Sequence, residues 1–505
     1  MHTELSLFNI QFKPMDNIKL DDFYKSWNNN ISRLSDGYLY DDNSNLRPTR
    51  YIFPYFKNII NNFLSGKINE LEKIILLPGI RGVGKTTLLM QIYQIEKFLS
   101  PDNSADAEIL RNLKKLDFRF YFDVSKFHLE QITLNEFFKY FEKINNLNFV
   151  NLNKKIIILL DEIHFDEKWS LFLKLLFDST KGHKNLLVIA TGSSAINLKI
   201  SADLMRRSTT TELFPMKFNE YLILKHNIYP INNLSDKLNH VLFDSQNAMK
   251  VFQELKNEEA KIDRYFIKLP ANCEDDFFKS GGFPFVTGLK NEVEIAERIK
   301  NVINGIITKD IITLKKFKSE TISKINDLLF LLANSDVITY EKLLKSLRID
   351  SIRTLSSLLD TLVMSGIIVL VKSYGKTYGA TRKTPKYLFL TPSLRSAILD
   401  NIYLSGIEGK KLEDYFALIF VNNLNKFFAH SLHYDKAEGG ADFVLTLNDR
   451  SNIVIEVGFN KEKTIQVEKT MKKVKSRYGL VIGSNNLELV NNTIVKIPLK
   501  FFMLI

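Results

Sequence analysis

The sequence is poor in cysteine and has no long hydrophobic run. Cys273 is the one cysteine among 505 residues, which excludes disulfides within the chain and any cysteine-based zinc site. No apolar run approaches the roughly 18 residues that a membrane span requires, and the N-terminal residues lack the basic and apolar segments of a signal peptide. We therefore expect a cytoplasmic protein with no membrane partner.

The sequence also lacks internal repeats and low-complexity segments, so solenoid and disordered architectures are not expected. A chain of 505 residues exceeds what one hydrophobic core normally supports, and two to four domains are predicted. Hydrophobic residues make up 45% of the chain and charged residues 25%, which is ordinary for a globular protein. The 38 phenylalanines can supply several cores.

The formal net charge is +12, with a calculated pI near 9.2. This excess favours a polyanionic partner such as DNA. Frequent Lys, Asn and Ile residues are equally compatible with an AT-rich genome, so charge alone leaves the partner open.

Elements alternate after residue 50 in a way that predicts an α/β fold. Apolar runs at 74–77, 116–124, 156–160 and 186–190 are expected to be strands, and 86–99 and 169–177 are expected to be helices. Such alternation predicts a parallel sheet with helices on both faces. The predicted parts are an N-terminal extension (1–50), a P-loop core (51–225), a helical lid (226–315), a winged helix (316–400) and a small α/β domain (408–505).

Residues 79–86 form a phosphate-binding motif. The string Gly79-Ile80-Arg81-Gly82-Val83-Gly84-Lys85-Thr86 matches G-x-x-x-x-G-K-[ST] between a predicted strand and a predicted helix. The backbone amides, with Thr87 in the first helical turn, are expected to surround the phosphates of ATP. Lys85 would reach the β and γ phosphates, and the Thr86 hydroxyl would bind Mg²⁺.

Two carboxylates follow an apolar strand. Asp161 and Glu162 end the run IIILLDE, which places them at the carboxyl edge of a parallel sheet, where ligands bind. Asp161 is predicted to help hold Mg²⁺, and Glu162 to act as the general base for the attacking water. Together with the phosphate loop, the pair predicts ATP hydrolysis.

Further polar residues follow the next strand. Thr191 ends the run at 186–190 and is expected either to sense the γ phosphate or to form a plain polar turn with its neighbours. Arg206 and Arg207 lie on a short predicted helix, where one of them could serve as an arginine finger. Ordinary surface arginines are the alternative.

These motifs resemble the prokaryotic, largely archaeal, ATPases of the AAA+ and STAND-related group. The similarity rests on GIRGVGKTTLL, IIILLDEIHFDEKWSLFLKLLFD, VIATGSSAINL and LFPMKFNEYL, with weaker likeness at 281–284 and 306–311. It implies an ATPase with a winged helix and a C-terminal nuclease-like domain of the PD-(D/E)xK type. For an ATP-driven, DNA-associated protein of this kind, we expect self-association, with the nucleotide site at an interface between copies. That group usually has Gly-Arg where this chain has Met205-Arg206-Arg207, so the finger is not assigned to one residue.

Residues 316–400 have the order of a winged helix. Two helical segments at 339–347 and 351–364 are separated by a short turn, and a Tyr-rich hairpin follows. The stretch 366–390 carries five basic residues and no acidic one. This pattern predicts phosphate contacts from the hairpin and a recognition helix, unless the fold serves protein contacts instead. The predicted DNA contacts are Arg353, Lys372, Lys376, Arg382, Lys383 and Lys386.

The C-terminal segment places Glu413 on a helix, Asp442 before a strand and Glu456 late in the next strand. Asp442 and Glu456 have the spacing of a nuclease metal site, in which carboxylates hold a divalent ion. Gly458 stands where such enzymes have a lysine, although Lys461 or Lys463 could substitute. The alternative is a metal-free domain used for binding or oligomerisation.

The sequence thus predicts a Mg²⁺-dependent ATPase that couples its nucleotide state to DNA through a winged helix. One alternative is an ATP-controlled signalling or defence switch with a C-terminal effector or oligomerisation module. The other is an ATP-gated, metal-dependent DNA nuclease.

Overall fold

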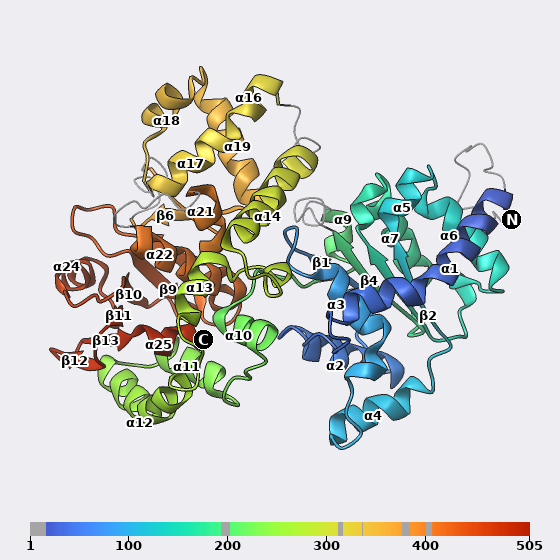
Figure 1. The fold of residues 1–505 in the computed structure, drawn as a ribbon, viewed down its shortest axis with the longest axis horizontal. Helices are drawn as coiled ribbons and strands as arrows, with labels where there is room; N and C mark the ends of the chain where they lie inside the picture. Colours follow the sequence, from blue (N-terminus) through green and yellow to red (C-terminus); the bar gives the residue numbers. More distant parts are fainter. Residues whose placement is uncertain (1–16, 193–201, 312–316, 336, 376–383, 400–406) are drawn as a thin grey trace, which may run out of the picture.

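The chain folds into two lobes that are joined by a narrow waist (Figure 1). The computed structural model describes residues 17–192, 202–311, 317–335, 337–375, 384–399 and 407–505. Residues up to about 213 build the first lobe, and the remainder builds the second, which contains the C-terminus.

The first lobe is built on a five-stranded parallel sheet with the order β2-β3-β4-β1-β5. Its strands are β1 Ile74–Pro78, β2 Phe118–Asp123, β3 Ile156–Asp161, β4 Leu186–Gly192 and β5 Thr209–Thr210. Every residue of β1, β3 and β4 is buried. Alternate residues of β1, β3 and β4 enter separate hydrophobic clusters on the two faces. The predicted α/β fold with a doubly covered parallel sheet is confirmed.

Helices on both faces connect these strands. They are α2 Phe53–Leu64, α3 Lys85–Tyr93, α4 Ser104–Leu113, α5 Val124–Leu129, α6 Leu134–Ile144, α7 Trp169–Ser179 and α9 Ala202–Met205. The helix predicted at 86–99 ends at Tyr93, and a 3-10 turn at Ile95–Phe98 completes the segment.

The predicted N-terminal extension contains a long helix, α1 Asn17–Leu39. This helix packs against α3 and α6 rather than standing apart (Figure 1). Leu20 and Tyr24 are buried in the hydrophobic cluster on one face of the first sheet, and the Trp27 indole donates a hydrogen bond to the Tyr121 carbonyl at 2.7 Å. The predicted loop at 41–45 is present, with the Asp41 carboxylate accepting from two backbone amides. The described part of this segment therefore belongs to the first lobe.

The waist of the molecule is at α10 Phe218–His226. The Asn219 amide donates to the Leu504 carbonyl at 2.8 Å, and α10 packs on α13 Cys273–Ser280. The predicted core boundary at residue 225 thus falls after a helix that packs on the second lobe.

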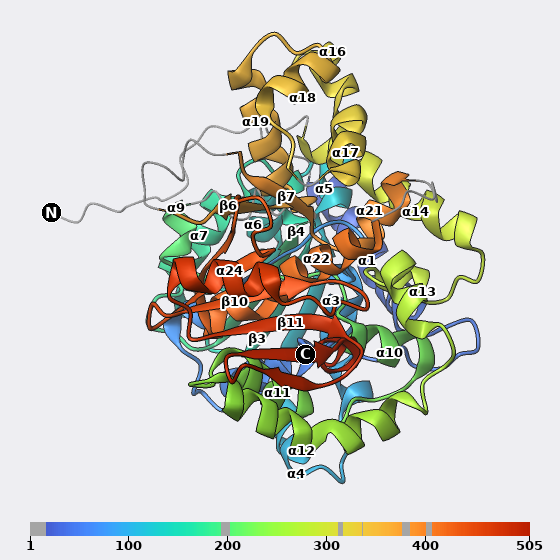
Figure 2. The ribbon, with the colours of Figure 1, turned by 90° about the vertical axis from the view of Figure 1, so that its left-hand side faces the viewer.

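The predicted lid divides into two parts. Helices α11 Leu234–Phe243 and α12 Ala248–Phe266 pack on the C-terminal strands, and the Tyr478 hydroxyl donates to the Leu242 carbonyl at 2.9 Å. Figure 2 shows α12 beneath β11 and the strands beside it. The later part, which includes α14 Glu292–Gly305, reaches the phosphate loop.

The segment predicted as a winged helix has its helices before a two-stranded antiparallel hairpin. These elements are α16 Ser319–Ser323, α17 Ile325–Asn334, α18 Tyr340–Leu347, α19 Ile352–Met364, β6 Ile368–Ser373 and β7 Lys386–Phe389, followed by α21 Pro392–Leu399. The predicted contacts Lys376, Arg382 and Lys383 lie outside the described residues.

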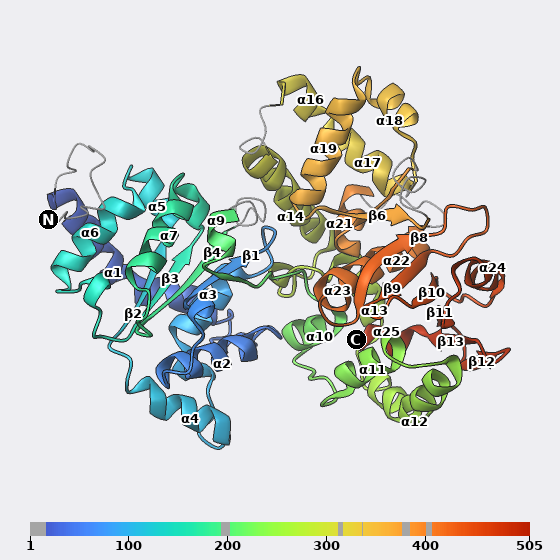
Figure 3. The ribbon, with the colours of Figure 1, turned by 180° about the vertical axis from the view of Figure 1, so that it is seen from behind.

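The hairpin belongs to an eight-stranded sheet with the order β12-β13-β11-β10-β9-β8-β6-β7. Strand β6 pairs in parallel with β8 Ala429–Tyr434, so the sheet crosses the predicted division between 400 and 408. The other strands are β9 Phe443–Leu447, β10 Asn452–Val457, β11 Tyr478–Ser484, β12 Glu488–Val490 and β13 Ile494–Pro498. Helices α22 Ile407–Ile419 and α24 Ile465–Val474 flank it (Figure 3), and α25 Leu499–Met503 ends the lobe. Within the described ranges, no helix is long and apolar enough to cross a membrane.

Candidate active site

The phosphate loop lies between β1 and α3, as the sequence predicts. Gly82 and Gly84 have φ angles of 81° and 94°, which residues with a side chain rarely adopt. Gly84 is directly followed by the first residue of α3, so the amino end of this helix faces the loop. The two glycines therefore let the backbone turn into the helix with its amide groups grouped at one point, as an anion site requires.

Lys85 is 5% exposed and folds back over the loop. Its ammonium group donates to the carbonyl oxygens of Gly79 at 2.9 Å and Ile80 at 3.1 Å. A bound phosphate oxygen would offer this ammonium a charged acceptor in place of neutral carbonyls, which is a stronger hydrogen bond.

Asp161 ends β3 beside the loop and is 2% exposed. Its carboxylate accepts hydrogen bonds from the Thr191 hydroxyl and, at 3.0 Å, from the Tyr121 hydroxyl, and it also hydrogen-bonds Thr86. Burial raises the pKa of Asp161, and the neighbouring Glu162 adds to this effect. The adjoining Thr86 hydroxyl and Asp161 carboxylate are oxygen donors of the kind that Mg²⁺ prefers, so this pair fits the predicted ion.

Glu162 has a φ of 51°, an uncommon conformation for a residue with a side chain. Its backbone amide donates to the Thr191 hydroxyl oxygen at 3.2 Å, and its carboxylate lies 3.5 Å from Nδ1 of His164. The side chain is partly exposed at the carboxyl edge of the sheet. It can therefore face a water molecule that enters with the nucleotide.

The remaining predicted catalytic residues, Thr191, Arg206 and Arg207, differ in how accessible they are. Thr191 is fully buried, and its hydroxyl hydrogen is directed to Asp161 rather than to open space. The Arg207 guanidinium bonds the Asp178 carboxylate at 2.9 Å, whereas the Arg206 side chain is 79% exposed with Asp203 at 3.6 Å. Arg206 is thus the more accessible of the two to a neighbouring molecule.

Sequence reasoning missed the contribution of α1 to this site. The Trp27 ring stacks on the Tyr121 ring with centroids 6.0 Å apart, and the Tyr121 hydroxyl in turn bonds Asp161. Burial raises the pKa of Tyr38 at the end of α1, and the carboxylates of Asp161, Asp123 and Glu162 raise it further. Trp27 and Tyr121 are both visible in the sequence as aromatic residues, but nothing in the local sequence shows that they are in contact.

The phosphate loop also touches two segments of the second lobe. A Cβ atom built on Gly82 would lie 2.6 Å from the Phe285 ring, and one built on Gly366 would lie 2.7 Å from Cγ2 of Ile80. Gly366 has a φ of 77° and lies in the turn between α19 and β6. Phosphate loop, lid and hairpin therefore meet at van der Waals distance.

The buried ion pair between Arg50 and Glu220 contacts the backbone of the phosphate loop. The Arg50 guanidinium bonds the Glu220 carboxylate at 2.7 and 3.0 Å, and it also donates to the carbonyls of Val83 at 2.7 Å and Phe214 at 2.9 Å. Burial opposes ionisation of Glu220, but the charge and hydrogen bonds of Arg50 keep the pKa of this carboxyl below its usual value. The network links the phosphate loop to α10 at the waist.

Comparison with known proteins agrees with this geometry. Residues 71–222 match the AAA domain family, and residues 275–404 match a domain of unknown function, DUF8612. The uncharacterized protein MJ1637 of Methanocaldococcus jannaschii is 33% identical over 474 residues, covering 91% of this chain and 90% of that protein. The chain belongs to the MJ1637 family and carries an AAA domain. The matched segment contains the phosphate loop, Asp161 and Glu162, so residues 71–222 form a P-loop domain of the AAA+ type.

Two further proteins are similar over smaller or more divergent regions. The uncharacterized protein MJ1544 of the same organism is 25% identical over 243 residues, which are 48% of this chain and 42% of that protein. A Walker-type ATPase of Pyrococcus abyssi aligns with 67% of this chain and 94% of its own, at 15% identity and a TM-score of 0.36.

A second polar cluster lies in the other lobe, at the predicted metal residues. The backbone amide of Asp442 donates to Glu456 at 3.1 Å, and the Asp442 carboxylate accepts from the Val457 amide at 3.0 Å. Asp442 and Glu456 are thus adjacent, as predicted. Among the described residues, however, no three His, Cys, Asp or Glu side chains are grouped so that they could hold a metal ion.

Two lysines fill this cluster. Lys461 donates to Glu456 at 2.6 Å and to Gln466 at 3.1 Å. A Cβ built on Gly458 would meet Cδ of Lys461 at 3.3 Å, so Lys461 occupies the space that a side chain at 458 would use. Burial raises the pKa of Glu456 to about 7, with Asp442 adding to the effect and Lys461 opposing it.

Lys386 corrects one predicted DNA contact. It is only 6% exposed, and its ammonium group pairs with Glu413 and lies 3.9 Å from Asp442. A side chain that is buried against two carboxylates does not reach a DNA phosphate. Arg353 and Lys372, by contrast, are exposed on α19 and β6.

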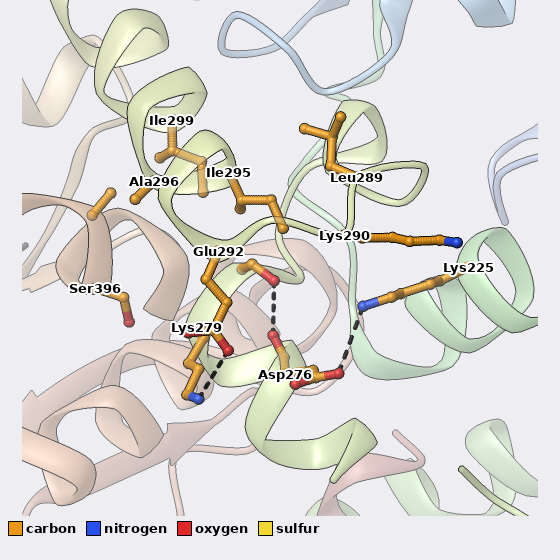
Figure 4. A pocket seen from close by; sticks show the side chains of 12 residues that line it. Lys225, Asp276, Lys279, Leu289, Lys290, Glu292, Ile295, Ala296, Ile299 and Ser396 are labelled. Atoms are coloured by element: carbon orange, nitrogen blue, oxygen red, sulfur yellow. Dashed lines mark hydrogen bonds and ion pairs between the residues drawn. The ribbon is translucent and has the colours of Figure 1, made fainter. Parts of the chain in front are cut away.

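A cavity of about 330 Å³ lies between α10, α13, α14 and α21 (Figure 4). Its rim carries Lys225 paired with Asp276 at 3.6 Å and Lys279 paired with Glu292 at 3.4 Å, over an apolar wall from α14. None of the residues predicted for the ATP site lines this cavity.

Proposed function

We propose that this AAA-domain protein hydrolyses ATP with Mg²⁺ and uses its nucleotide state to control DNA binding by the helices and hairpin of residues 316–400. In this proposal, the helices and hairpin of residues 316–400 act as a winged helix. The contact between Ile80 of the phosphate loop and Gly366 at the base of the hairpin carries this proposal.

The chemistry follows from the positions of the side chains. Lys85 turns from the loop carbonyls toward the phosphates, and Glu162 accepts a proton from the attacking water. Tyr121 and Thr191 fix the Asp161 carboxylate beside Thr86. Mg²⁺ held there would neutralise the charge that develops on the phosphate oxygens.

The coupling follows from close packing. Ile80 is 2% exposed and lies against a glycine turn with no room for a Cβ, so a shift of the loop must move one of the two partners. Phe285 lies against Gly82 in the same way. A change at the phosphates is thereby transmitted to the lid and to the base of the hairpin.

DNA is the proposed polyanion because basic residues gather on this unit. Arg353 lies in the first turn of α19, and Lys372 is exposed near the end of β6. In sequence, the intervening stretch adds Lys376, Arg382 and Lys383 without an acidic residue. Phosphate contacts of this kind release counterions, so binding should weaken steeply with salt.

Self-association is part of the proposal. An exposed arginine near the edge of an AAA sheet can complete the nucleotide site of a neighbouring copy, and Arg206 has that exposure. Light scattering with and without ATP tests this point, and a mass that stays monomeric in both states would contradict it.

The main test combines ATP turnover and DNA binding in the full chain. Lys85→Ala should abolish turnover, whereas Lys290→Ala, an exposed lysine elsewhere, should leave it unchanged. Turnover by Lys85→Ala at the parent rate would refute the assignment of the site.

The DNA arm uses a matched triple variant. Replacing Lys372, Arg382 and Lys383 by Ala should weaken DNA binding and reduce the slope of log affinity against log salt by about 2.7. Replacing Lys256, Lys261 and Arg264, three exposed cations of α12, removes the same charge and should change the slope little. Equal losses in both variants, or tight ATP retention without turnover or DNA affinity, would favour the ATP-controlled switch instead.

A further inference from the structure

The second polar cluster contains three carboxylates and two lysines that meet from four parts of the second lobe. Glu413 comes from α22, Asp442 precedes β9, and Glu456 lies in β10. Lys386 comes from β7, and Lys461 follows β10. Glu413 and Glu456 are 8% and 1% exposed, so these charges must be balanced within the protein.

Each lysine serves a different part of the cluster. Lys461 bonds Oε1 of Glu456 at 2.6 Å, while Oε2 of Glu456 accepts from the Asp442 amide at 3.1 Å. Lys386 pairs with Oε2 of Glu413 and lies 3.9 Å from Oδ1 of Asp442, and Oδ2 of Asp442 accepts from the Val457 amide at 3.0 Å. The Lys386 ammonium thus lies between the carboxylates of Glu413 and Asp442.

Lys386 is fixed in this position by its strand. All four residues of β7 are buried, and the Lys386 ammonium lies 5.4 Å from the centre of the Phe443 ring. The next residue of α22, Asp414, accepts from the Phe389 amide at 2.8 Å and from Arg395 at 2.6 Å. Glu413 and Asp414 therefore hold β7 near both of its ends.

We propose that Lys386 is a built-in cation that replaces a divalent metal in this carboxylate cluster, and that it fastens the hairpin strand β7 to α22 and β9. The cluster is an internal ion-pair centre and not a nuclease site. This inference is independent of the ATP and DNA assignments.

Charge and position both support this role. A hard divalent ion takes oxygen ligands, and the Lys386 ammonium already pairs with the Glu413 carboxylate and lies beside that of Asp442. The competing ammonium is tethered, so it is present at a high effective concentration that a metal in solution must overcome. Removing it would free the oxygens of Glu413 and Asp442 together.

The test is Mn²⁺ binding by the full chain without nucleotide, measured by calorimetry and by the electron paramagnetic resonance signal of free Mn²⁺. Lys386→Met keeps the length of the side chain and should create a site in the second lobe, with affinity on the order of 100-fold above that of the parent. Lys461→Met removes the same charge from the same cluster but leaves Lys386 in place, and it should show no such gain.

Three results would overturn the proposal. The first is that the parent protein binds Mn²⁺ in the second lobe, or cleaves plasmid DNA, and that Asp442→Asn abolishes this activity. The others are equal gains in Lys386→Met and Lys461→Met, and no gain in a folded Lys386→Met. If Lys386→Met does not fold, the double variant Lys386→Met with Glu413→Gln replaces it, because both charges of the pair are then absent. This double variant should fold without gaining an Mn²⁺ site. An Mn²⁺ site in it would contradict the role of Glu413.

Discussion

The buried pair of Arg50 and Glu220 allows a quantitative prediction. Their side chains are 6% and 4% exposed, and the guanidinium makes two bonds to the carboxylate and one each to the carbonyls of Val83 and Phe214. Arg50→Met leaves the Glu220 charge buried without its partner. Breaking a buried pair in this way costs about 3–5 kcal/mol.

The loss of stability should appear in the unfolding of the first lobe. Both tryptophans, Trp27 and Trp169, lie there, so their fluorescence during urea or thermal unfolding reports on this lobe. For a unit of about 200 residues, 1 kcal/mol shifts Tm by about 2–4 °C, so a fall on the order of 10 °C is expected.

The double variant Arg50→Met with Glu220→Leu separates charge from packing. Both charges are absent, and a buried pair can often be replaced by apolar groups at little cost. The carbonyls of Val83 and Phe214 still lose a donor, so a deficit of about 1–3 kcal/mol should remain. The double variant should therefore be more stable than Arg50→Met alone.

The pH dependence has a definite sign. In the parent, the pKa of Glu220 is lowered, so its stabilisation is present above the unfolded value of about 4.3 and is lost as pH falls below it. In Arg50→Met the buried carboxyl of Glu220 has no partner, so its pKa is expected to be raised. Acidification from pH 7 toward 4.3 protonates it in the folded state and should therefore reduce the difference in unfolding free energy between the variant and the parent. A loss below about 1 kcal/mol, or a double variant no more stable than Arg50→Met, would refute this reasoning.

Two further predictions concern single side chains. Tyr121→Phe removes one hydrogen bond to the Asp161 carboxyl group and should lower kcat by about tenfold with little change in KM; unchanged steady-state kinetics would exclude a positioning role. Cys273 is 4% exposed, and burial raises the pKa of its thiol to about 11, so Ellman's reagent at pH 8 should react with it only after unfolding. Rapid reaction of the folded protein would contradict that burial.

The central strands were predictable because parallel strands are buried on both faces and leave an uninterrupted apolar run. The runs at β1, β3 and β4 were placed within two residues of their ends for this reason. The phosphate loop and Asp161 follow directly from these strands. Site residues that directly follow a predictable strand could therefore be located from the local sequence.

Helix α1 was missed although its signal was present. Leu20, Tyr24, Trp27 and Ile31 recur at helical spacing, but numerous Asn and Asp residues between them suggest a polar extension. Tyr121 and Lys386 could not be assigned in the same way, because their partners are brought to them only by the sheet order. A basic residue in a basic hairpin predicts a surface contact, and only its neighbours in space show that Lys386 is buried.

The helix α1 also bears on where the working ATPase begins. The segment shared with other AAA domains starts at residue 71, yet the indole that stacks on Tyr121 belongs to residue 27. A protein shortened to the shared segment would keep every residue of the phosphate loop and lose the ring that supports the partner of Asp161. The segment that matches the AAA domain family is thus smaller than the part of this chain that surrounds the side chain of Asp161.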